Sequence, residues 1–114
     1  MIRRTIFCAG SILFCASLCV SAAFAADKAA KGDADKGKAV FEQCSMCHNI
    51  DSPEKKMGPS LQGLYKKKTL QNGKPVNDAN VLAQINVGGN GMPGYADMLS
   101  SDDKADLLAY MHTL

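Results

Sequence analysis

Five consecutive residues, Cys44-Ser45-Met46-Cys47-His48, bring two thiols and an imidazole into one short stretch. Two cysteines separated by two residues can bond the two vinyl groups along one edge of a haem. A histidine directly after the second cysteine can then ligate the iron. The spacing therefore predicts one covalently attached haem c, held by Cys44, Cys47 and His48.

Three other kinds of site also use a Cys-x-x-Cys pair, and the rest of the chain supports each of them less well. A zinc site needs two more ligands, but the remaining cysteines all lie near the N-terminus, at Cys8, Cys15 and Cys19. A thioredoxin-like redox pair follows a strand, whereas residues 33–43 have a helical pattern. A simple disulfide would leave His48 without a role.

A haem iron bound by one histidine has a second axial position, and its occupant decides between electron transfer and ligand binding. Met92 is the preferred candidate, because its thioether is a soft ligand and the glycines in 88–91 let the backbone approach a haem closely. Met98 stays open as a rival, whereas Met57 follows His48 too closely to reach the opposite face. Met111 is expected to be a core side chain on the apolar stripe of the last helix, and His112 is a weaker candidate than Met98.

The N-terminus has the layout of a secretory signal peptide. Arg3 and Arg4 precede the apolar run 6–20, and a small-x-small cleavage site ends at Ala25. Cleavage there predicts export to the periplasm. If the segment stayed uncleaved, its apolar part would be just long enough to anchor the protein in a membrane, which is the alternative.

The chain is accordingly divided into a signal peptide (1–25), a flexible leader (26–32) and one small haem domain (33–114). The formal net charge of +2 matches the two arginines of the signal peptide, so the exported part is formally neutral. Neither nucleic acid nor an anionic membrane surface is therefore expected as a partner. A domain this small often needs stabilisation beyond its own hydrophobic core, and a covalent apolar cofactor would supply part of its interior.

The first expected helix leads directly into the haem motif. Asp33 is a good N-cap, and the helix is expected to end at about Cys44. Gly37, Val40 and Phe41 share one face. A glycine inside a helix costs about 1 kcal/mol, so close approach of another helix at Gly37 is expected.

Further helices follow after the haem motif. A short helical piece is expected within 60–67, and a longer helix over about 78–87, capped by Asn77 or Asp78 and ended by Gly88. The last helix is expected to run to about His112.

The start of that last helix is marked by Ser100 and Asp103, which are spaced as a capping box. No strand pattern is present, so the sequence predicts an all-α fold.

Taken in order, these motifs resemble those of the class I cytochromes c, and the likeness covers nearly all of the chain after the signal peptide. It rests on the segments 32–41, 44–48, 58–59, 92–93 and 106–110. The resemblance implies three to five short helices wrapped around one covalent haem, with the N- and C-terminal helices crossing.

The resemblance also implies roles for single residues. Gly37 is expected to meet Leu107 and Tyr110 where the terminal helices cross, and Pro59 to accept a hydrogen bond from His48. The chain has no tryptophan to bind a haem propionate. Three residues remain open for that role: Tyr65, Asn72 and Asn77.

The implied function is that of a soluble, monomeric periplasmic carrier, not an enzyme. It would move single electrons from a dehydrogenase or quinol-oxidising complex to a terminal oxidase or reductase. Redox partner proteins would dock at the exposed haem edge. An acidic partner could be steered by the lysines at positions 55, 56, 66, 67 and 68.

Two alternatives to the carrier function remain. One is a cytochrome subunit of a quinoprotein dehydrogenase-type complex, and the other is a haem enzyme or gas sensor with an open sixth site.

Overall fold

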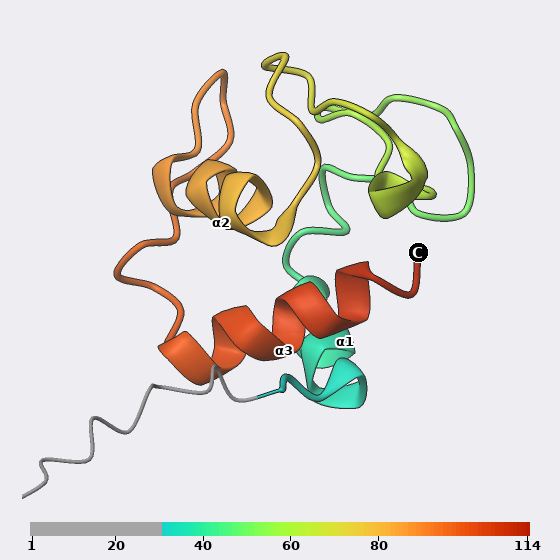
Figure 1. The fold of residues 1–114 in the computed structure, drawn as a ribbon. Helices are drawn as coiled ribbons and strands as arrows, with labels where there is room; N and C mark the ends of the chain where they lie inside the picture. The colour runs from blue at the N-terminus through green and yellow to red at the C-terminus, as the bar shows by residue number, and fades with distance from the viewer. Residues whose placement is uncertain (1–30) are drawn as a thin grey trace, which may run out of the picture.

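A computed structural model describes residues 31–114 (Figure 1). The predicted signal peptide and leader residues 26–30 lie outside the described residues. The elements are α1 (Ala34–Phe41), the 3₁₀ helix η1 (Leu64–Lys66), α2 (Asp78–Val87) and α3 (Ser101–Met111). Within residues 31–114, β-pairing is limited to the isolated bridges Thr69–Pro75 and Gly89–Met92. The all-α prediction is therefore confirmed.

Helix α1 begins as the sequence predicts and ends earlier. The Asp33 side chain accepts hydrogen bonds from the backbone N–H groups of Asp35 and Lys36, at 2.9 and 3.3 Å. The helix ends at Phe41 and not near Cys44, so the expected end was three residues too late. The reason is a change to tighter turns, in which the Cys44 N–H binds the Phe41 carbonyl at 2.8 Å.

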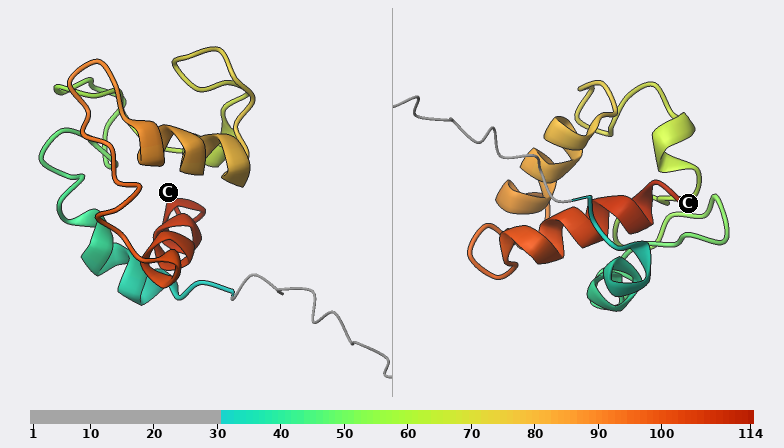
Figure 2. Two further views of the ribbon diagram at one scale, coloured as in Figure 1. Left: turned by 90° about the vertical axis from the view of Figure 1, so that its left-hand side faces the viewer. Right: turned by 60° about the horizontal axis from the view of Figure 1, so that its bottom comes forward.

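The N- and C-terminal helices pack against each other, as Figure 2 shows from two sides. A Cβ on Gly37 would overlap the backbone carbonyl of Asp106 and lie 2.8 Å from the Tyr110 Cβ. The rings of Phe41 and Tyr110 meet with centroids 5.3 Å apart, and Leu107 beside them is 1% exposed. The helix crossing expected at Gly37 is confirmed.

The two later helices start at side-chain caps. Asn77, and not Asp78, caps α2 by accepting a hydrogen bond from the Asn80 N–H at 2.8 Å. Gly88 follows α2 with a φ of 67°, which a glycine adopts without strain. At α3, Ser100 and Asp103 form both halves of a capping box. Side-chain chemistry at the caps therefore fixes where both helices begin.

The core draws on all the helices and on the loop after α2. Its buried apolar side chains are Phe41, Leu64, Val81, Ile85, Tyr95, Leu107 and Met111. Helix α3 lies between α1 on one side and α2 on the other (Figure 1). No helix within residues 31–114 is both long and apolar enough to cross a membrane.

Candidate functional site

The haem motif is folded into a single turn directly after α1. The N–H groups of Cys47 and His48 both bind the Cys44 carbonyl, at 3.1 and 3.0 Å. Both cysteines are partly buried and neither forms a disulfide, so the disulfide alternative gains no support. Burial raises the pKa of the Cys44 thiol, and the neighbouring Cys47 raises it further.

The His48 ring is held by the backbone of the turn at 58–59. The ring is 9% exposed, and its Nδ1 lies 2.8 Å from the Pro59 carbonyl oxygen. Because a carbonyl oxygen can only accept, Nδ1 carries a proton, and Nε2 is the ring nitrogen available to a metal. The contact that the resemblance implied between His48 and Pro59 is present.

Gly58 provides the space for that ring. A Cβ on Gly58 would lie 2.7 Å from Nδ1 and 3.0 Å from Nε2 of His48. The imidazole therefore packs directly on the main chain, and its orientation is fixed before any ligand is considered.

The donor set at this turn fits a haem c and does not fit zinc. Within residues 31–114 there is no group of three or more His, Cys, Asp or Glu side chains placed to hold a metal ion. Two thiols on one turn and one imidazole whose Nε2 is available to an iron are the groups that covalent haem attachment requires.

Met92 lies in a tight loop that follows α2. Four successive residues, 88 to 91, have positive φ values, and Asn90 at 52° is the one that is not glycine. Gly89 and Met92 exchange two backbone hydrogen bonds, of 2.9 and 3.1 Å. Met92 is partly buried and packs against the same core cluster as Cys44.

The other methionine candidates have different surroundings. Met98 is 66% exposed and Met57 is 79% exposed, whereas Met111 is buried on α3. The side chain of His112 is 48% exposed and binds Asp78. Met92 is thus the partly buried candidate that lies outside a helix.

The three residues left open for a haem propionate already have partners. The Tyr65 hydroxyl donates to Asp78 Oδ1 at 2.6 Å, and the Asn72 amide donates to Gln84 at 3.0 Å. The Asn77 side-chain oxygen caps α2.

A cluster of titratable side chains, Tyr65, Asp78 and His112, was not predicted from the sequence. His112 Nε2 lies 2.8 Å from Asp78 Oδ1, and the His112 ring stacks on Tyr65 with centroids 3.6 Å apart. Burial and the Asp78 carboxylate raise the pKa of Tyr65, and the Tyr65 hydrogen bond lowers the pKa of Asp78. The three residues come from three distant segments, so no local pattern indicates their contact.

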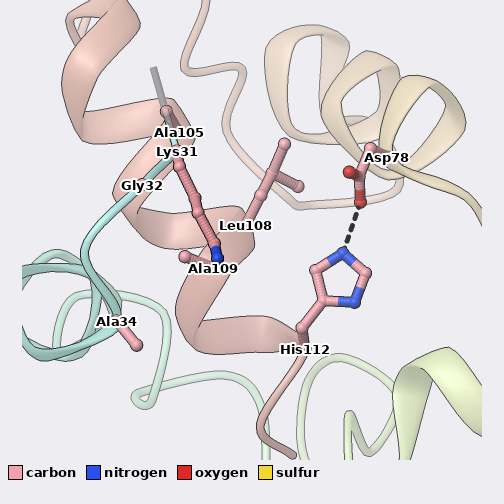
Figure 3. Close-up of a pocket in the computed structure, with 8 residues that line it drawn as sticks. All are labelled: Lys31, Gly32, Ala34, Asp78, Ala105, Leu108, Ala109 and His112. Atoms are coloured by element: carbon pink, nitrogen blue, oxygen red, sulfur yellow. Dashed lines mark hydrogen bonds and ion pairs between the residues drawn. The ribbon is translucent and has the colours of Figure 1, made fainter. Parts of the chain in front are cut away.

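Asp78 and His112 also line a groove of about 550 Å³ along α3 (Figure 3). Its other lining residues are Lys31, Gly32, Ala34, Ala105, Leu108 and Ala109. No residue of the haem motif lines this groove, so it is separate from the haem site.

A family model described as Cytochrome c matches residues 34–114. The chain belongs to the cytochrome c family. A cytochrome c-553-like protein of Synechocystis sp. is 33% identical over 87 residues, which cover 75% of this chain and 73% of that protein. Cytochrome c2 iso-1 of Magnetospirillum molischianum is 28% identical over 99 residues, covering 71% of this chain and 99% of that protein.

A solved structure has the same fold. Cytochrome c6 from the diatom Phaeodactylum tricornutum matches with a TM-score of 0.56 and 25% identity, covering 72% of this chain and 93% of that one. Membership of the cytochrome c family confirms the fold class and one covalent haem c. It supports a role in electron transfer in general, and indirectly supports the expectation that this cytochrome c is not an enzyme.

Proposed function

We propose that this cytochrome c is a soluble, monomeric periplasmic carrier of single electrons. Its donor would be a dehydrogenase or a quinol-oxidising complex, and its acceptor a terminal oxidase or reductase. The bound haem supplies a one-electron Fe(II)/Fe(III) couple. The observation that carries the proposal is the buried His48 ring, whose Nδ1–H donates to the Pro59 carbonyl at 2.8 Å, so that Nε2 is the nitrogen available to an iron.

Each residue of the site has an assigned part. The Cys44 and Cys47 thiols would hold the haem covalently, each through a thioether bond formed by addition of its S–H to one vinyl group. His48 Nε2 and Met92 Sδ would bind the haem iron, and the Pro59 carbonyl keeps the His48 ring in place. With both protein ligands bound, the iron would keep no position open for substrate or gas, which favours a carrier over the alternative of a haem enzyme or gas sensor.

Partner proteins would dock where the cysteines attach the haem. Met46 and Met57 are each 79% exposed there, and Met57 Sδ lies 3.9 Å from Cys47 Sγ. Exposed apolar side chains of this kind suit a short-lived protein contact.

The lysines expected to steer a partner, at positions 55, 56, 66, 67 and 68, differ in how far their amino groups are already engaged. Lys56 and Lys67 donate to backbone carbonyls, at 3.0 and 2.8 Å. Within residues 31–114, no hydrogen bond or ion pair engages the amino groups of Lys55, Lys66 and Lys68. These three are therefore the better candidates for steering an acidic partner.

The proposal is tested by a spectroelectrochemical titration of the protein isolated from the periplasmic fraction. A reversible one-electron transition, with an N-terminus at Ala26, is expected. Peroxide turnover or binding of an added gas to the native protein would contradict the carrier function. Stable co-purification with a dehydrogenase would assign the protein to the alternative of a complex subunit.

A further inference from the structure

Ser60 shares an unusual property with the axial histidine. Among residues 31–114, the buried polar side chains are those of His48, 9% exposed, and Ser60, 8% exposed. Ser60 directly follows Pro59, whose carbonyl receives the His48 hydrogen bond. A buried hydroxyl is costly unless it is hydrogen-bonded, so its partners indicate what it does.

The polar groups of Ser60 tie together separate parts of the chain. Its hydroxyl donates to the Ser52 carbonyl at 2.6 Å and lies 3.5 Å from that of Asn49. The same hydroxyl oxygen accepts from the Gln62 N–H at 3.2 Å. The Ser60 carbonyl accepts from Lys67 Nζ at 2.8 Å. Ser60 is thus hydrogen-bonded both to the loop before it and to the segment after it.

The hydrogen bonds of Ser60 also restrain the Pro59 carbonyl, because one rigid peptide group joins the two residues. The carbonyl of Pro59 and the N–H of Ser60 belong to the same planar peptide group. On either side of that group, the Gly58 N–H binds the Cys47 carbonyl and the Leu61 N–H binds that of Asn49, each at 2.8 Å. Once the Ser60 side chain is anchored, the peptide plane has little freedom to rotate.

We propose that Ser60 is a positioning residue for His48. The Ser60 hydroxyl holds the Pro59 carbonyl on the His48 Nδ1–H, and this contact lowers the reduction potential of the haem iron. The proposal rests on the function proposed above only for His48 as iron ligand. A short, well-oriented hydrogen bond at Nδ1 makes the imidazole donate more electron density to the iron, which favours the oxidised iron. A weaker hydrogen bond at Nδ1 would therefore raise the reduction potential.

The test uses the haem-loaded protein with Ser60→Ala and two readouts. The first is the exchange rate of the His48 Nδ1 proton, followed by NMR in the reduced state. The second is the midpoint potential from an equilibrium titration. Loss of about 1 kcal/mol, the value of an ordinary hydrogen bond, corresponds to roughly fivefold faster exchange. The potential is expected to rise.

Two variants serve as matched controls. Ser60→Thr keeps the hydroxyl and is expected to restore both readouts towards those of the unsubstituted protein. Ser52→Ala removes a hydroxyl from the same loop but keeps the carbonyl that Ser60 uses, so both readouts are expected to stay unchanged. If Ser60→Ala does not yield folded protein, Ser60→Cys, a weaker donor in the same place, takes its part.

A folded Ser60→Ala variant with unchanged proton exchange and potential would overturn the proposal. So would a change in melting temperature alone, because Ser60 would then only support the loop. Neither readout needs a redox partner. Failure of the carrier function with its partners would leave this result intact, and failure at Ser60 would leave the carrier function intact.

Discussion

At the scale of single residues, the His48 ring is oriented by main chain on two sides. Gly58 packs against its face and the Pro59 carbonyl binds its Nδ1. Neither contact depends on a long side chain that would lose conformational entropy. The imidazole would therefore meet a haem iron with its Nδ1–H already paired and its orientation already fixed.

Gly58→Ala is expected to lower the free energy of unfolding of the haem-loaded protein by about 1–3 kcal/mol, the usual cost of overpacking. The new Cβ would overlap the His48 ring, and both the ring and the turn would have to shift. Denaturant unfolding followed by haem absorbance measures the loss. Met57→Ala, at an exposed neighbouring position, is the control and should change the stability little. Equal stability of the two variants would refute the packing seen at Gly58.

Three residues could be assigned to the haem from the sequence because their spacing is itself the signal. Cys44, Cys47 and His48 are adjacent in the chain, and Pro59 followed from the resemblance. Ser60 could not be predicted, because a serine in a loop is usually a surface residue. Its role depends on contacts with carbonyls that no sequence pattern marks.

At the scale of the elements, the crossing of α1 and α3 fixes the position of the haem motif in the fold. The motif begins three residues after α1 ends, so any shift of α1 on α3 moves the cysteines. The helix starts were predictable because Asp33, Asn77 and Ser100 are side-chain caps. The end of α1 was not, because the tight turns after Phe41 have no comparable sequence signal.

Gly37→Ala is expected to destabilise the protein by about 1–3 kcal/mol, although alanine is the better helix former by about 1 kcal/mol. The steric cost outweighs the propensity because the Cβ would overlap the Asp106 carbonyl and approach the Tyr110 Cβ to 2.8 Å. Thermal unfolding measures the change. Ala39→Gly, at an exposed site on the same helix, reports the propensity alone. A gain of stability in Gly37→Ala would contradict the close crossing.

At the scale of the whole molecule, the cluster of Tyr65, Asp78 and His112 joins three separate segments. It links η1, the first residue of α2 and the residue that follows α3. The Asp78 side chain is 59% exposed, so the link is screened by solvent. Its contribution is therefore best detected through the titration of Asp78.

The lowered pKa of Asp78 has a definite sign for stability. A carboxyl whose pKa is lower in the folded protein stabilises the fold above its ordinary pKa, and this contribution is lost as the pH falls through the lowered value. Tyr65→Phe removes the largest cause of the shift, so it is expected to raise the pKa of Asp78 and weaken this acid dependence.

NMR titration of the Asp78 carboxyl tests this expectation directly. His112→Gln is the comparison and should also raise the pKa of Asp78, because His112 lowers this pKa through a hydrogen bond and a charge interaction of its own. An unchanged Asp78 pKa in Tyr65→Phe would rule out the hydrogen bond as its source.

The measurement that tests the carrier function most directly is the absorption spectrum of the oxidised, haem-loaded protein. Iron bound by His48 and Met92 is expected to give the weak far-red band of methionine ligation, and Met92→Ala is expected to abolish it. Met98→Ala, at an exposed position, should leave the band unchanged. A five-coordinate spectrum in the unsubstituted protein, or a band that survives Met92→Ala, would contradict the proposed pair of axial ligands.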